Sequence, residues 1–140
     1  MFKLSKKADY ALVALSHLQR KNAPASAKEI AQTYNLSNQM LANVLKSLSN
    51  AGLLISKRGT LGGYNLSRQP GQISLGEVIT LFEGEKSFSD CSSMDKDCVS
   101  AAQCPARRPV LMIHRKIKDF VDGISLADLA NHREFAKQSI

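Results

Sequence analysis

The sequence predicts a mostly α-helical protein with one small β-hairpin, and three patterns carry this prediction. Apolar residues recur at three- and four-residue spacing in several segments, as in amphipathic helices. Serines stand directly before several of these segments, where a helix N-cap is expected. A basic, glycine-rich stretch at 57–63 lies between two short apolar segments, which is typical of a hairpin. The length of 140 residues fits one domain with its own core.

The first two helices are predicted from an apolar face and a cap. A helix over about 5–20 has one face formed by Ala8, Ala11, Leu12, Leu15 and Leu18. The stretch 22–25 contains Pro24 and breaks this pattern. The second helix begins at Ser26, because Ser26 and Glu29 have the spacing of a capping box, in which each side chain bonds the other residue's backbone N–H.

The third helix divides cleanly into an apolar and a polar face. Ser37 is its expected N-cap, and Gly52 suits the position just after its end. We expect the buried side to be Met40, Leu41, Val44, Leu45 and Leu48. The residues left facing out are Asn38, Gln39, Ala42, Asn43 and Lys46.

A hairpin follows the third helix. Its strands are expected at 53–56 and 64–67, with a flexible basic tip at 57–63. Two helices joined by a tight turn and followed by such a hairpin describe a winged helix-turn-helix. The full prediction is a winged helix-turn-helix plus a long dimerisation helix.

The C-terminal half contains three further helical segments. Ser74 and Glu77 predict a capping box that opens a helix ending at Gly84. Pro105 is the expected first residue of a long helix. On that helix, apolar residues step by three and four, which indicates packing along another helix: Val110, Ile113, Ile117, Phe120 and Ile124. Gly123 is expected to end it, and Ser125 to cap a short final helix.

These segments predict three regions within one compact domain. Residues 1–84 form a winged helix-turn-helix region, 85–104 a cysteine-containing loop, and 105–140 the dimerisation helix with the final helix. No apolar run approaches the roughly 20 residues of a membrane span, and no signal peptide is recognised. We therefore expect a cytoplasmic protein without a membrane partner.

The positive charge is concentrated in the first half of the chain. Net charge is +7 overall, whereas residues 1–68 carry ten basic and two acidic residues. Such asymmetry is typical of a nucleic-acid-binding region joined to a neutral body. A lysine-rich surface without a nucleic-acid partner is the alternative, and charge alone does not separate the two.

The helix-turn-helix pattern, the wing and the charge together favour binding to double-stranded DNA. Amides on the third helix suit base edges, and hydroxyls and N–H groups at helix starts suit phosphates. Arg58 at the wing tip suits a minor groove, where glycines permit close approach. The candidate DNA-binding residues are Ser26, Lys28, Ser37, Asn38, Gln39, Asn43, Lys46, Arg58, Gly62 and Tyr64.

Every cysteine of the chain lies between Cys91 and Cys104, with Cys98 between them. Thiolates are soft ligands for zinc, copper(I) or iron–sulfur clusters, but no short zinc-type pair is present. Incidental thiols or a metal-free redox switch explain the same spacing equally well. The histidines are scattered, and no phosphate loop, nucleophile motif or carboxylate pair is found, so an enzyme with a small-molecule substrate is not expected.

Five stretches resemble the Rrf-two family of bacterial regulators, across about the whole chain. They are the Asp9-Tyr10-Ala11-Leu12 opening, the segment through Leu48, the wing motif at 58–64, the segment 75–79 and the cysteine loop. The resemblance implies a homodimeric transcription factor on a partly palindromic operator. It also implies a [2Fe-2S] or [4Fe-4S] cluster on Cys91, Cys98 and Cys104 that senses iron, oxygen, nitric oxide or redox state.

Two departures from the family pattern concern the cluster. The first cysteine gap is one residue longer than usual, and Arg107 stands where the iron–sulfur assembly branch has a histidine ligand. The nitric-oxide branch instead resembles this chain at Asp9, which is the candidate fourth ligand across the dimer; a surface ion pair is its alternative role.

The resulting prediction is a regulator, expected to be a repressor, whose operator affinity an iron–sulfur cluster controls. The alternative is a metal-free cysteine thiol sensor of the same fold, regulated by oxidation or by a protein partner.

Overall fold

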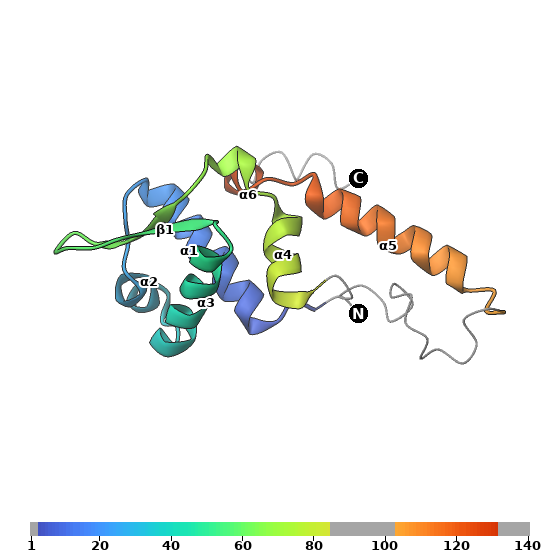
Figure 1. Ribbon diagram of the computed structural model, residues 1–140, viewed down its shortest axis with the longest axis horizontal. Coiled ribbons are helices and arrows are strands. Elements are labelled where there is room, and N and C mark those ends of the chain that lie inside the picture. The colour runs from blue at the N-terminus through green and yellow to red at the C-terminus, as the bar shows by residue number, and fades with distance from the viewer. Residues whose placement is uncertain (1–2, 85–102, 132–140) are drawn as a thin grey trace.

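Residues 3–84 form a helical head with a projecting hairpin at one end of the molecule (Figure 1). One long helix extends toward the other end of the molecule. The computed structural model describes residues 3–84 and 103–131. The predicted mostly helical fold with one hairpin is confirmed. The elements are α1 (Lys6–Lys21), α2 (Ala27–Tyr34), α3 (Asn38–Asn50), β1 (Leu54–Lys57), β2 (Gly63–Leu66), the short 3-10 helix η1 (Pro70–Gln72), α4 (Leu75–Glu83), α5 (Arg107–Asp122) and α6 (Leu126–Ala130).

The core of the head lies where α1, α2 and α3 meet. Leu15 and Leu18 from α1 pack with Ile30 from α2 and with Leu41 and Leu45 from α3, and all five are buried. Burying each such side chain stabilises the fold by about 1.5–3 kcal/mol. Every fully buried side chain of the described residues is apolar, so the polar residues of the head lie on its surface.

Serine caps fix where the helices begin. The hydroxyl oxygens of Ser26, Ser37 and Ser74 each accept a hydrogen bond from the backbone N–H three residues later, as the sequence predicts. Such a cap contributes about 1 kcal/mol. Ser5 caps α1 in the same way, and Ser125 with Asp128 forms a complete capping box at α6.

The two capping boxes predicted at α2 and α4 are only half formed. The Glu29 carboxylate bonds Lys21 and His17 instead of the Ser26 backbone, and the Glu77 carboxylate bonds Arg68. The prediction was wrong on this point because a charged donor from another segment makes a stronger hydrogen bond than a neutral N–H.

The hairpin forms as predicted, but β1 begins and ends one residue later, and β2 one residue earlier, than the predicted limits. β1 and β2 are antiparallel, with Leu54 opposite Leu66 and Lys57 opposite Gly63. Beyond this pair, Tyr64 exchanges two backbone hydrogen bonds with Ala25, at 3.0 and 2.8 Å. The segment before α2 is therefore joined to the base of the wing by an isolated β-bridge, outside the two-stranded sheet.

The C-terminal end of α5 and the short helix α6 lie against the head (Figure 1). α5 begins at Arg107, so the prediction that Pro105 is its first residue was wrong: a turn closed by the Arg107 N–H and the Cys104 carbonyl comes first. Leu126 of α6 is buried in the core, and its N–H donates to the Ile73 carbonyl at 2.8 Å. α5 itself buries only Val121 among its side chains.

Three of the five residues of the expected apolar face of α5 are exposed: Ile113, Ile117 and Phe120, at 52%, 37% and 63%. Val110 is half-buried, and Ile124 lies beyond the end of α5, so the predicted face extended too far. Within residues 3–84 and 103–131, no helix is both long and apolar enough to cross a membrane.

Candidate nucleic-acid interface

α2 and α3 form a helix-turn-helix whose tight turn depends on Asn35. Asn35 ends α2 in the left-handed conformation at φ 53°, which asparagine tolerates better than most residues. The chain then reaches Ser37, whose N–H donates to the Tyr10 hydroxyl at 3.3 Å before its side chain caps α3. The start of α3 is thus fixed both to its own first turn and to α1.

The polar face of α3, formed by Asn38, Gln39, Asn43 and Lys46, is exposed along its whole length. The opposite face is buried by Leu41, Val44, Leu45 and Leu48. The predicted division of this helix is confirmed except at Met40, which is only half-buried. A helix fits the major groove, and free amides and an ammonium are groups that bond base edges and phosphates there.

The wing carries two exposed basic residues, Lys57 and Arg58, away from the helices (Figure 1). Gly62 lies so close to the Lys57 carbonyl oxygen that a Cβ atom would come within 2.5 Å of it. Tyr64 is half-buried against the core, and its backbone is bonded to Ala25. Of the three wing residues predicted to bind DNA, Arg58 is free to do so, whereas Gly62 and Tyr64 shape and anchor the wing.

The start of α2 presents a second, smaller group of candidates. The Ser26 oxygen accepts from the Glu29 N–H at 3.1 Å, so its hydroxyl hydrogen is left to donate outward. Lys28 follows in the first turn and is exposed. A hydroxyl and an ammonium at a helix start suit a phosphate oxygen.

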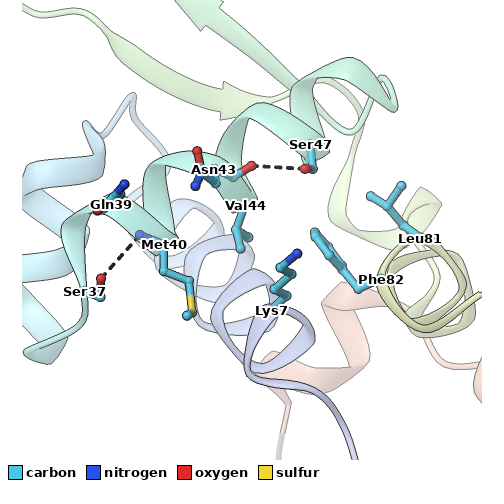
Figure 2. A pocket seen from close by; sticks show the side chains of 9 residues that line it. All are labelled: Lys7, Ser37, Gln39, Met40, Asn43, Val44, Ser47, Leu81 and Phe82. Carbon is cyan, nitrogen blue, oxygen red and sulfur yellow. Dashed lines mark hydrogen bonds between the residues drawn. The ribbon is translucent and has the colours of Figure 1, made fainter.

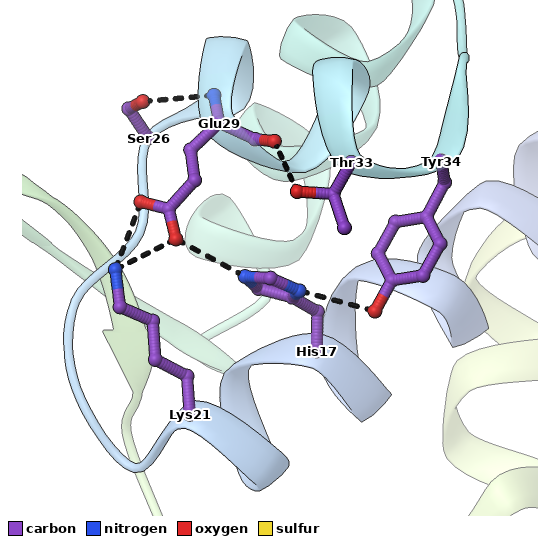
Figure 3. Close-up of polar contacts among 6 residues, drawn as sticks. All are labelled: His17, Lys21, Ser26, Glu29, Thr33 and Tyr34. Atoms are coloured by element: carbon purple, nitrogen blue, oxygen red, sulfur yellow. Dashed lines mark hydrogen bonds and ion pairs between the residues drawn. The ribbon is translucent and has the colours of Figure 1, made fainter.

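A polar network that the sequence pattern did not reveal joins α1 to α2 (Figure 3). His17 lies with Nδ1 3.1 Å from the Tyr34 hydroxyl and Nε2 3.3 Å from Glu29 Oε1. Lys21 Nζ bonds both oxygens of Glu29, at 2.7 and 2.8 Å. The hydrogen bond from Lys21, followed by that from His17, holds the pKa of the Glu29 carboxyl below its ordinary value. No periodicity signals such contacts, because they depend on the chain reversal at 22–25.

Two of the four predicted metal ligands, Asp9 and Cys104, lie within the described residues. Asp9 is exposed in the first turn of α1, and Cys104 is half-buried just before α5. In Figure 1 the first turn of α1 lies beside the end of α4, whereas α5 begins far from the head. Cys91 and Cys98 lie outside the described residues, and the described part holds no group of three metal-binding side chains.

The donor chemistry still fits an iron–sulfur cluster in part. Cys104 is a free thiol, and Asp9 shows no ion pair with any residue in the described ranges, so both have ligand atoms to offer.

Comparison with known proteins gives a consistent result. The profile of the Rrf2 family, described as an iron-dependent transcriptional regulator, matches residues 4–132. The transcriptional regulator CymR of Bacillus subtilis is 35% identical over 135 residues, covering 94% of this chain and 92% of that protein. Its structure, titled as the global cysteine regulator, superposes with a TM-score of 0.75 and covers 94% of this chain and 98% of that one.

Two further solved structures are similar over nearly the whole chain. T. potens IscR is 30% identical with a TM-score of 0.72, covering 99% of this chain and 93% of its own. An oxidized form of Staphylococcus aureus CymR is 32% identical with a TM-score of 0.70, covering 91% and 95%.

Proposed function

Because this chain belongs to the Rrf2 family of transcriptional regulators, we propose that it binds operator DNA as a homodimer and represses transcription. The polar face of α3 would enter the major groove, and the wing would contact the flanking groove. The observation that carries this proposal is the exposure of the amides of Gln39 and Asn43 beside Lys46, on a helix whose other face is locked into the core.

Dimerisation is supported by the uncovered apolar face of α5. Large apolar side chains rarely gather on the surface of a monomer without a partner. The face runs along the helix from Ile113 through Ile117 to Phe120, which suits a second copy of the same helix packed against it. Two heads held this way would meet DNA half-sites about 34–36 Å apart, one helical turn.

Control by an iron–sulfur cluster is the finer part of the proposal. Cys91, Cys98 and Cys104 would supply three thiolates, and Asp9 of the second chain would supply the fourth ligand. When bound, the cluster would supply a centre whose stability depends on iron supply, oxidants or nitric oxide. The description of the family as iron-dependent and the soft thiolate ligands support this assignment.

A second candidate is a metal-free thiol sensor with the same DNA-binding head. The similarity to a protein titled a global cysteine regulator, and to a related regulator solved in an oxidized form, favours it. In that case oxidation of the cysteines or a protein partner would set the DNA affinity without any iron.

Iron and sulfide counts on protein purified without oxygen separate the two candidates. The cluster proposal expects a coloured protein with visible absorption and an electron paramagnetic resonance signal after reduction or oxidation. Colourless, iron-free protein with reactive thiols, and with a DNA affinity that falls after mild oxidation, would support the thiol sensor instead.

DNA binding is tested independently of either sensor. The logarithm of the affinity for duplex DNA should fall linearly with the logarithm of salt concentration, with a slope of about −0.9 per phosphate contacted. A slope near zero would overturn the DNA-binding proposal.

A further inference from the structure

A pocket of about 490 Å³ opens between α1, α3 and the end of α4 (Figure 2). Lys7 reaches into it from α1, and Leu81 and Phe82 close it from α4. The remaining wall comes from α3, through Ser37, Gln39, Met40, Asn43, Val44 and Ser47. We call this space the α3 pocket. Its volume falls within the roughly 300–1,000 Å³ of small-molecule sites.

One side of the α3 pocket is apolar. The half-buried side chains of Met40 from α3 and Phe82 from α4 supply its apolar surface, with the buried Val44 behind them. Leu81 is 39% exposed at the rim. Covering these surfaces would remove apolar area from water and would favour a ligand with an apolar body.

The other side offers hydrogen-bond donors and one positive charge. Lys7 is the only charged residue in the lining, and it forms no ion pair with the residues that the structure describes. The Ser37 oxygen is used as an acceptor by the Met40 N–H at 3.3 Å, so its hydroxyl hydrogen is left to donate. The Lys7 ammonium has no ion-pair partner among the described residues, and the Ser37 hydroxyl is a neutral donor. These groups favour binding of a carboxylate over a neutral or cationic group.

We propose that the α3 pocket binds a small carboxylate with an apolar chain, and that this ligand competes with DNA. The competition rests on the proposed function, because Gln39 and Asn43 belong both to the lining of the pocket and to the polar face of α3. A carboxylate bound by Lys7 in this pocket would place a negative charge beside the α3 face that is proposed to approach the DNA phosphates. The ligand would thus lower DNA affinity without involving the cysteines.

Calorimetric titration of the full-length protein with octanoate tests binding, with octanamide as the uncharged counterpart. Octanoate should bind saturably at a single site and octanamide at least about tenfold more weakly, as expected for loss of a charge-assisted hydrogen bond. Lys7→Gln should weaken octanoate binding by a similar factor, whereas Lys7→Arg should retain it. Lys6→Gln is the matched control, because Lys6 is an exposed neighbour outside the lining.

The effect on DNA is measured with a duplex obtained by selection against the same protein. Octanoate should lower the affinity of the wild type and of Lys6→Gln, and should leave that of Lys7→Gln nearly unchanged. Equal binding of acid and amide, no saturable binding, or equal behaviour of the two lysine variants would overturn the ligand proposal. Binding through Lys7 without an effect on DNA would overturn the competition. Failure of the wild type to bind any duplex would instead count against the proposed function, since the titration needs no DNA.

Discussion

Tyr64 and Ala25 exchange backbone hydrogen bonds in both directions, and this pair ties the wing to the entrance of the helix-turn-helix. The N–H of Ala25 donates to the Tyr64 carbonyl at 3.0 Å, and the N–H of Tyr64 donates to the Ala25 carbonyl at 2.8 Å. The two parts proposed to contact DNA are therefore joined directly through their backbones. The close approach requires a glycine beside Tyr64.

Gly63→Ala is expected to destabilise the head. A Cβ at this position would come within 2.5 Å of the Ala25 carbonyl group, and the φ of 148° is unfavourable for a side chain. Strain of this kind costs about 1–3 kcal/mol, measurable as a lower midpoint in urea unfolding. Gly71→Ala is the control, since nothing lies within 4 Å of its added Cβ; an equal loss in both variants would contradict this account.

The Glu29 ion pair should contribute stability only above acidic pH. The pKa of Glu29 lies below its ordinary value of 4.5, so the folded state gains from the carboxylate above that pH and loses the gain as pH falls through the lowered pKa. Glu29→Gln should therefore cost up to about 1 kcal/mol at neutral pH and nothing in strong acid. In a Lys21→Ala background the same change should cost less, as a double-mutant cycle would measure.

Two substitutions on the polar face of α3 should affect DNA binding differently. Asn43→Ala should cost about 1–3 kcal/mol on the preferred duplex and relax base preference at one position. Lys46→Ala should weaken binding to all duplexes and reduce the salt slope by about 1. Fluorescence anisotropy over a salt series measures both, with Arg115→Ala on α5 as the control for loss of one positive charge.

Phe120→Asp should convert a dimer into a monomer. Phe120 is 63% exposed within the apolar face of α5, and a charge buried in a helix–helix seam is strongly unfavourable. Sedimentation should show the mass fall by half, together with weaker DNA binding. Arg115→Asp places the same charge on the opposite side of the helix and should leave the mass unchanged. A wild-type protein that sediments as a monomer would contradict the proposal.

Cys104→Ala should abolish the visible absorption of oxygen-free protein, and Cys98→Ala should do the same, because each removes a proposed thiolate ligand. Asp9→Asn should retain iron but change the electron paramagnetic resonance spectrum. Asp119→Asn, at an exposed carboxylate on α5, is the matched control. Should Cys98→Ala lose its colour yet bind the operator with unchanged affinity, the cluster would not be the switch.

Local signals in the sequence predicted the helix starts and the two faces of α3. Ser26, Ser37 and Ser74 each cap the helix that follows, because a cap depends only on residues within one turn. The partner of Glu29 was predicted incorrectly, because Lys21 approaches it only once α1 and α2 are packed together. The start of α5 was placed two residues early, since Pro105 fits a turn as well as a first helical position.

The candidate sites were predictable to different degrees. The exposed amides of α3 follow from helical periodicity alone. The α3 pocket does not, because Lys7, Met40 and Phe82 come from three separate helices and share no sequence pattern. The cluster ligands stay a prediction: Cys91 and Cys98 lie outside the described residues, and the described residues hold no group of three metal-binding side chains.

The contact between Leu126 and Ile73 limits how this protein can be recombined. Leu126 is buried beneath η1, and its N–H is the donor to the Ile73 carbonyl. A head cut after α4 would keep α3, the helix proposed to contact bases, but would leave a hole in its core where Leu126 packs. Chimaeras that exchange the DNA-binding half between relatives should therefore retain α6 with the head, although α6 lies on the other side of the cysteine segment in the gene.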